Sequence, residues 1–229
     1  MRPLLVLTLG MVLYPLTSQR VAEYSVVASE PFPRGPAPGM ALPVELHRDD
    51  YSAVRKFSGI YSVDYRLVLA IMEHESRFDR MALSPRGARG MLQIMPATGR
   101  ELESELNLSD VTHPAQHLHA GIYYYSKLSD LFSSAPDDDR RRLALAAYNA
   151  GPSRIYDAQE LAVYLGENPD DWSALRHVLP LLSRRYSTLH SHVWGDARPP
   201  HGYFTGWRET VRYVDRVMST YAGYLAPRS

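Results

Sequence analysis

The sequence has no cysteine among its 229 residues. It therefore forms no disulfide, offers no thiolate as a metal ligand or nucleophile, and cannot be lipidated through a thiol. It also has no excess of charge, because 25 Lys and Arg balance 25 Asp and Glu. Proteins that bind nucleic-acid phosphates normally carry a basic surplus, so nucleic acid is not the expected partner.

Phenylalanine and tryptophan are scarce, with 5 and 3 copies against 16 tyrosines. Tyrosine offers a flat apolar face with a polar rim, which suits sugar-binding clefts and wet interfaces. Composition alone equally allows a tyrosine-rich protein with no special ligand.

The amino terminus has an apolar run, but it is too short to span a membrane. Leu4–Leu13 is a largely apolar run of 10 residues behind the positive charge of Arg2, whereas a membrane-spanning helix needs about 20. This pattern is typical of a secretory signal, and Val26–Ala28 offers small residues for cleavage. We predict a signal peptide over residues 1–28 and export to the periplasm or cell envelope. No stable membrane span is expected after signal removal; an uncleaved anchor or a buried helix is the alternative.

Five prolines and two glycines between Pro31 and Pro43 predict an extended linker over residues 29–43. Residues 44–229 are expected to form one domain. Few stretches in it alternate with period two, and most show helical spacing. We predict an all-α fold of short helices, irregular backbone over 79–95, and a long loop over 187–206. The helices are expected at 44–57, from the cap Asp64 to about Glu75, at 96–106, from Pro114, at 140–148, at 171–178 and at 208–221.

Glu75 is a candidate general acid. It follows an apolar helix stripe that ends at Met72, so its carboxyl can face a cleft with one apolar wall. Desolvation there raises a carboxyl pKa, as a general acid requires. A solvated glutamate at a helix end is the alternative. His74-Glu75 does not form the zinc motif H-E-x-x-H, because Phe78 stands where the second histidine belongs.

Three sequence blocks occur in order. They are ESRFDRMALSPRGARGMLQIMPATG from Glu75 to Gly99, LALAAYNAGP from Leu143 to Pro152, and ETVRYVDRV from Glu209 to Val217. Together they resemble the lytic transglycosylases of the soluble type, which have a lysozyme-like fold of the goose type. The segment Gly166–Ser183 further resembles the catalytic domain of membrane-bound lytic murein transglycosylases of the F type. The resemblance implies that residues 44–229 form a transglycosylase catalytic domain.

The resemblance implies cleavage of the β-1,4 bond between N-acetylmuramic acid and N-acetylglucosamine in peptidoglycan glycan strands. Glu75 would act first as acid and then as base, which leaves 1,6-anhydromuramyl ends, with no metal and no cofactor. The residues that the resemblance places at the substrate are Ser84, Gln93, Met95, Tyr148, Asn149 and Tyr213. From the residues alone, Tyr148 and Tyr213 can equally be core positions with satisfied hydroxyls.

Two other functions stay open. A lysozyme-like muramidase would need a second carboxylate to orient water, and Glu73 and Asp79 are the nearest candidates. A non-catalytic peptidoglycan-binding module would keep the fold alone. His113, His117 and His119 have spacing that could suit a metal, but no Asp, Glu or Cys accompanies them, so no metal site is predicted. The sequence leaves the oligomeric state and endo or exo action open.

Overall fold

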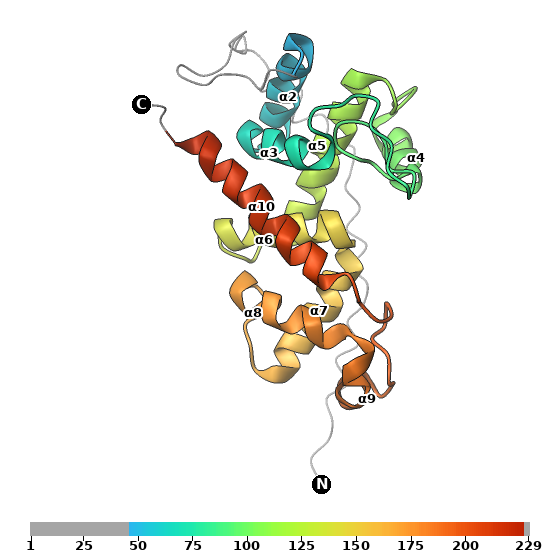
Figure 1. Ribbon diagram of the computed structural model, residues 1–229, viewed down its shortest axis with the longest axis vertical. Helices are drawn as coiled ribbons and strands as arrows, with labels where there is room; N and C mark the ends of the chain where they lie inside the picture. Colours follow the sequence, from blue (N-terminus) through green and yellow to red (C-terminus); the bar gives the residue numbers. More distant parts are fainter. Residues whose placement is uncertain (1–45, 227–229) are drawn as a thin grey trace. The chain divides into compact units, whose positions relative to one another are not determined.

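The computed structural model describes residues 46–226, and apart from two isolated β-bridges between residues 83 and 94 the regular secondary structure in that range is helical (Figure 1). The predicted signal peptide and linker lie outside the described residues. None of the helices within 46–226 is long and apolar enough to cross a membrane. The helices are α2 (Arg48–Ile60), α3 (Tyr65–Ser76), α4 (Pro96–Leu106), α5 (Pro114–Asp130), α6 (Asp137–Ala150), α7 (Pro152–Leu165), α8 (Trp172–Val178), α9 (Ser187–Trp194) and α10 (Trp207–Leu225), with short 3-10 helices at Leu179–Leu182 and Arg184–Tyr186.

Most helices begin where the sequence supplies a start signal. The Asp64 carboxylate accepts a hydrogen bond from the backbone N–H of Arg66 and caps α3. Pro96, Pro114 and Pro152 stand in the first turns of α4, α5 and α7, where the missing N–H costs no helical hydrogen bond. The predicted starts at Asp64, Pro96 and Pro114 are therefore confirmed.

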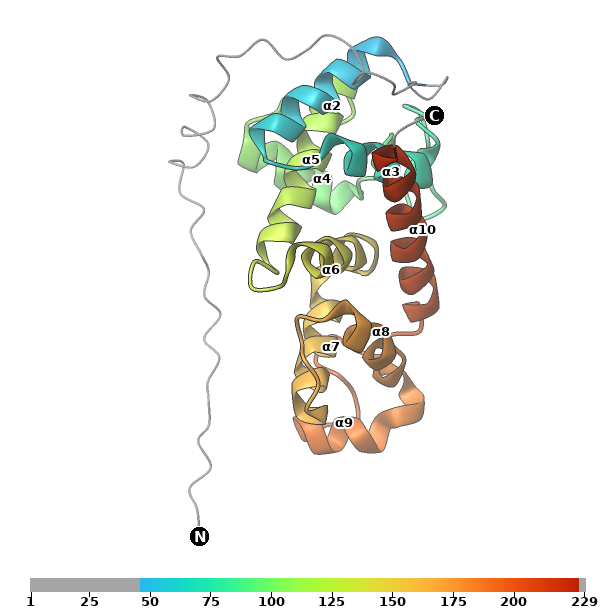
Figure 2. The ribbon, with the colours of Figure 1, turned by 90° about the vertical axis from the view of Figure 1, so that its left-hand side faces the viewer.

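Helix α10 packs against both α3 and α6 (Figure 2). The contact is apolar at its centre, where Leu69 of α3, Ala146 of α6 and Val214 and Val217 of α10 are fully buried. Burial of such side chains contributes about 1.5–3 kcal/mol each for the larger ones. This packing brings the carboxyl end of α3, which carries Glu75, against α10.

The region between α6 and α10 differs from the prediction in two places. Residues 152–165 form α7, which the sequence does not predict, and the expected loop 187–206 begins with α9. The glycines and prolines that suggest a loop all lie at Gly195 or beyond, and Gly195 (φ 73°) ends α9 in a left-handed conformation. His190, which lies in the segment expected to be a loop, is fully buried, with ring nitrogens 2.7 and 3.2 Å from the carbonyl oxygens of Leu181 and Ala197.

Candidate active site

Glu75 stands in the last turn of α3 above the buried side chains of Ile71 and Met72. Its Oε1 accepts a hydrogen bond of 2.7 Å from the hydroxyl of Tyr213 on α10. Burial raises the pKa of Glu75 to about 7, against the opposing effect of the Tyr213 hydrogen bond, which favours the ionised form. A pKa raised to about 7 makes both the protonated and the ionised carboxyl accessible near neutral pH, as proton transfer in both directions needs.

The two residues before Glu75 also contact α10. Tyr224 donates to Glu73 Oε2 at 2.6 Å, and Thr220 Oγ1 lies 2.8 Å from His74 Nε2. Together with Tyr213, these hydroxyls form a row on one side of α10 that faces the end of α3. The row fixes the rotation of α3 and hence the direction of the Glu75 side chain.

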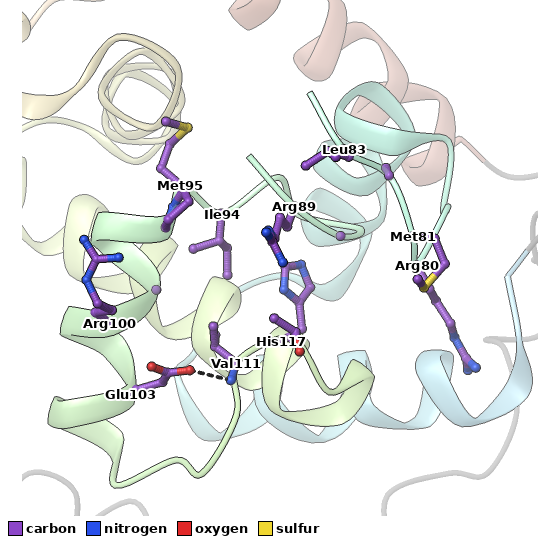
Figure 3. Close-up of a pocket in the computed structure, with 15 residues that line it drawn as sticks. Arg80, Met81, Leu83, Arg89, Ile94, Met95, Arg100, Glu103, Val111 and His117 are labelled. Atoms are coloured by element: carbon purple, nitrogen blue, oxygen red, sulfur yellow. Dashed lines mark hydrogen bonds between the residues drawn. The ribbon is translucent and has the colours of Figure 1, made fainter. Parts of the chain in front are cut away.

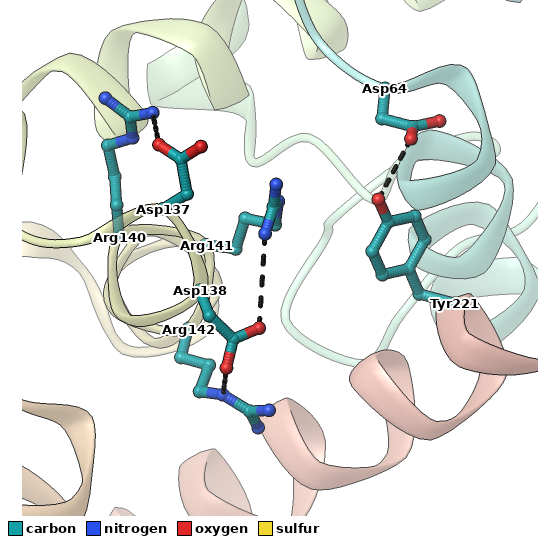
Figure 4. A network of polar contacts seen from close by, with 7 residues as sticks. All are labelled: Asp64, Asp137, Asp138, Arg140, Arg141, Arg142 and Tyr221. Carbon is teal, nitrogen blue, oxygen red and sulfur yellow. Dashed lines mark hydrogen bonds and ion pairs between the residues drawn. The ribbon is translucent and has the colours of Figure 1, made fainter. Parts of the chain in front are cut away.

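A further hydroxyl of α10 holds the other end of α3. Figure 4 shows Tyr221, which donates to Asp64 Oδ2 at 2.9 Å, beside the charged first turns of α6. In those turns Asp138 contacts both Arg141 and Arg142, at 4.0 and 2.9 Å. These pairs are partly exposed, and such pairs contribute only about 0–1 kcal/mol. They fit the acidic start of a helix better than a ligand site.

The loop between α3 and α4 begins with a left-handed turn. Arg77 (φ 53°) ends α3 and Phe78 (φ 67°) continues the turn with its ring buried. The Ser76 hydroxyl donates to the carbonyl of Met91 at 3.0 Å, which ties the helix end to the far part of the loop. The irregular backbone predicted for 79–95 is confirmed, and its course is fixed by specific contacts.

Leu92 is the residue that anchors this loop. Its N–H donates to His117 Nε2 at 3.0 Å, and its carbonyl accepts from the Tyr148 hydroxyl at 2.6 Å. Its side chain lies on Gly121 of α5, where an added Cβ would come within 2.4 Å of Leu92 Cδ1. Burial lowers the pKa of His117 to about 4, so the ring is neutral and serves as acceptor.

Tyr148 and Gln93 are both positioned through this anchor. Burial, and then the charge of Glu75, raise the pKa of Tyr148 well above its usual value. Gln93 has a positive φ of 46°. Its amide donates to the carbonyls of Gly90 and Ala82 at 2.9 and 3.3 Å. Both amide protons are thus used inside the loop, and its Oε1 is left to accept from a ligand.

The remaining predicted residues lie on neighbouring segments. Ser84 Oγ accepts from the N–H of Ala88 at 2.9 Å and shapes the tight turn between them, while its hydroxyl proton stays available for donation. Asn149 is exposed, and its Oδ1 accepts from Thr210 of α10 at 2.8 Å. Met95 is 42% exposed at the start of α4.

Reasoning from the sequence missed His117, Leu92 and the row residues Thr220 and Tyr224. The signals for them are weak. The positions of the row residues along α10 are compatible with any buried helix face, and nothing local marks Leu92 as a hydrogen-bonding centre. Within residues 46–226, no group of three His, Asp or Glu side chains is arranged to hold a metal ion.

Comparisons with known proteins point to one family. The family model described as "Transglycosylase SLT domain" matches residues 52–168. A membrane-bound lytic murein transglycosylase F from Desulfosudis oleivorans is 32% identical over 73% of this chain and 34% of its own length. A membrane-bound lytic murein transglycosylase F 2 from Alkalilimnicola ehrlichii is 40% identical over 66% of this chain and 31% of its own. The chain thus spans about a third of the length of the curated relatives it matches.

Two solved structures show the same fold. The 70 kDa soluble lytic transglycosylase from Escherichia coli superposes with a TM-score of 0.53 at 22% identity, over 76% of this chain and 23% of that one. An inactive mutant of the lytic transglycosylase Slt from Pseudomonas aeruginosa superposes with a TM-score of 0.55 at 24% identity, over 80% of this chain and 24% of that one. The expected all-α, lysozyme-like fold is confirmed.

Proposed function

Because this chain belongs to the Transglycosylase SLT domain family, we propose that it is a peptidoglycan lytic transglycosylase. It cleaves the β-1,4 bond between N-acetylmuramic acid and N-acetylglucosamine and acts in the cell envelope, where that polymer lies. The observation that carries the proposal is the partly buried Glu75, with a pKa of about 7 and a hydrogen bond from Tyr213.

The reaction uses one carboxyl twice. Protonated Glu75 gives its proton to the oxygen that leaves C1 of the muramyl sugar, and the bond from C1 to that oxygen breaks. Ionised Glu75 then takes the proton of the muramyl C6 hydroxyl, whose oxygen bonds to C1 and closes a 1,6-anhydro ring. Glu75 ends protonated, no water is consumed, and no metal or cofactor takes part. A pKa near 7 suits both half-reactions.

The substrate is held by groups around that carboxyl. Gln93 Oε1 accepts from a sugar hydroxyl, and the Ser84 hydroxyl and the Asn149 amide donate. Met95 forms an apolar part of the cleft wall. Tyr148 contacts the substrate with its ring. Its hydroxyl proton is already donated to the Leu92 carbonyl, so the hydroxyl holds Leu92 in place.

Hydrolysis would need a second carboxylate to orient a water molecule. The two nearest candidates are engaged elsewhere. Glu73 accepts from Tyr224 on the side of α3 that faces α10. Asp79 is exposed, and its Oδ1 accepts from the backbone N–H of Met81 at 2.8 Å. The geometry therefore favours attack by the tethered C6 hydroxyl, whose effective concentration exceeds that of a free nucleophile.

The test is digestion of purified peptidoglycan in oxygen-18 water, read by mass spectrometry. We expect unlabelled 1,6-anhydromuramyl ends. Glu75→Gln should lower the rate at least ~10²-fold, while Glu167→Gln, at an exposed position between α7 and α8, should not. Labelled reducing ends in most fragments would show that the enzyme is a muramidase. Strand binding by wild type without cleavage would show a non-catalytic module.

A further inference from the structure

The groups proposed to hold the substrate come from two separately anchored parts of the chain. Gln93 and Met95 belong to the α3–α4 loop, and His117 both anchors that loop and lines the hollow beside α4 (Figure 3). Asn149 instead stands near the end of α6, where its Oδ1 accepts from Thr210 in the first turn of α10. Whatever places Thr210 therefore also places the side-chain amide of Asn149.

The amino end of α10 has little to hold it locally. Its N-cap is Gly206, which has no side chain to accept from the first backbone N–H groups of the helix. The three residues after Gly206 are at least partly exposed, and Thr210 is the first buried one. The start of α10 therefore depends on the segment that precedes it, which runs from α9 past α7 (Figure 1).

That segment is bonded to α7 through two consecutive residues. The Asp157 carboxylate accepts from the backbone N–H of His201 at 3.2 Å through Oδ2, and its Oδ1 lies 2.7 Å from His201 Nδ1. The guanidinium of Arg154 donates to the carbonyl of Gly202. Gly202 has a φ of 89°, so the chain turns at the point where α7 holds it. Helix α10 begins at Trp207, shortly beyond this turn.

The burial of Asp157 costs free energy that an apolar side chain would not cost. Asp157 is 1% exposed, whereas the His201 side chain is 50% exposed and fills no core space. Burial raises the pKa of Asp157, although the hydrogen bonds from His201 act against this rise. A buried carboxylate with a partner is weak evidence of stability. What it provides here is a fixed arrangement, because both of its oxygens are directed at one residue of the segment.

We propose that Asp157 is a positioning residue for the reaction. Through His201 it sets where α10 begins, and Thr210 then holds Asn149 by its Oδ1, which leaves the amide N–H groups free to donate to the sugar. The inference rests on the proposed function, in which Asn149 is such a donor. It gives the chain between α6 and α10 a role in substrate binding that no side chain of that segment performs by direct contact.

The reacting carboxyl is held by other contacts. Tyr213, which donates to Glu75, is followed by Val214, and both Val214 and Val217 are fully buried where α10 packs against α3. Loss of the contacts of Asp157 should therefore weaken the hold on the substrate and leave the acid in place. The result is a change in KM with kcat unchanged.

The test measures kcat and KM on purified glycan strands. Asp157→Ala and Thr210→Val should each raise KM about 3- to 10-fold, the effect of one hydrogen bond. The double variant should be no worse than Thr210→Val alone, because both changes act on the same amide. Asp157→Asn keeps an acceptor for the His201 N–H and places a donor opposite the neutral ring nitrogen, so its KM should stay near that of wild type.

Asp196→Ala is the matched control. Asp196 is an exposed aspartate of the same segment that accepts from the backbone N–H of Arg198 at 3.2 Å, and its removal should leave both constants as in wild type. Partial unfolding lowers the amount of active enzyme, and with it the apparent kcat, but not KM. A lower kcat at unchanged KM in Asp157→Ala, or additive losses in the double variant, would therefore overturn the positioning role. If Asp157→Ala does not fold, His201→Ala takes its place, and an unchanged KM there would overturn the role equally.

A measurement without substrate separates this inference from the proposed function. In ¹⁵N-labelled protein, the side-chain amide signals of Asn149, assigned by their loss in Asn149→Ala, should shift in Asp157→Ala and stay in place in Asp196→Ala. Such a shift in a protein that does not cleave strands would refute the proposed function and leave the link from Asp157 to Asn149 standing. Asn149 signals that are the same in Asp157→Ala as in wild type would refute the link itself.

Discussion

The change Tyr213→Phe tests how the pKa of Glu75 is set. Burial raises this pKa to about 7, and the hydroxyl of Tyr213 holds it down by donating to Oε1 at 2.7 Å. Phenylalanine keeps the ring and removes the donor. The ionised form of Glu75 then loses a favourable contact while the protonated form loses little, so the pKa should rise above about 7.

The size of the shift follows from the type of bond. A hydrogen bond to a charged group contributes about 1.5–3 kcal/mol, and one pKa unit corresponds to about 1.4 kcal/mol. The expected shift is therefore ~1–2 units. Since the general acid must start protonated, kcat/KM falls as pH rises through the Glu75 pKa in the free enzyme. In Tyr213→Phe this alkaline limb should move to higher pH by the same amount.

The assay is the pH profile of kcat/KM on purified glycan strands. Tyr224→Phe is the matched control, because it removes a hydroxyl from the same helix that bonds to Glu73 instead of Glu75. It should leave the limb where it is in wild type, even if the maximal rate falls. An alkaline limb in Tyr213→Phe that stays in place, or moves to lower pH, would refute the role of the Tyr213 hydroxyl in setting the Glu75 pKa.

Two further predictions concern the anchored loop. The pKa of His117 is lowered to about 4 in the folded state from an ordinary 6.5, so the contribution of His117 to stability should be constant above pH 6.5 and fall by about 3 kcal/mol as pH drops to 4. Because Glu75 and His119 also titrate in this range, the measurement is the difference in urea-unfolding free energy between wild type and His117→Gln, which should change by this amount between pH 7 and pH 4. Gly121→Ala forces a Cβ to within 2.4 Å of Leu92 Cδ1 and should cost about 1–3 kcal/mol in thermal unfolding, together with activity. Gly223→Ala on α10, where nothing lies within 4 Å of the added Cβ, should be neutral or stabilising; equal behaviour of the two glycine variants would contradict the proposed anchor.

Helix boundaries can be predicted where a single residue determines them. Asp64 caps α3 with its own side chain, and Pro96 and Pro114 fit only the first turn of a helix. The pair Gly151-Pro152 indicates the end of a helix, and α6 does end there, but Pro152 also begins α7. Local sequence does not separate these two meanings, because the tertiary packing of Ile155 and Leu161 decides that the chain continues as a helix.

The site can be predicted only in part. The apolar stripe before Glu75 indicates a desolvated carboxyl, and the raised pKa agrees. The family resemblance places Tyr213 at the substrate, but the hydrogen bond from Tyr213 to Glu75, 138 residues away, is not predictable from local sequence, since periodicity gives the buried face of α10 but not its partner. The Leu92–His117 bond is not predictable, because it depends on a loop path through positive φ values at Gly90 and Gln93.

The proposed reaction requires Glu75 to donate a proton in the first step and to accept one in the second. Two structural features together make both steps possible. Burial between α3 and α10 without a hydrogen-bond donor would keep the carboxyl protonated and make it a poor base after the first step. Several donors, as in a carboxylate with two or three N–H partners, would keep it ionised and make it a poor acid. One hydroxyl donor in a buried setting leaves the pKa near 7. Because that donor stands on α10, the packing of α10 on α3 is itself part of the proposed chemistry, and changes that loosen this contact should shift the pH profile as well as lower stability.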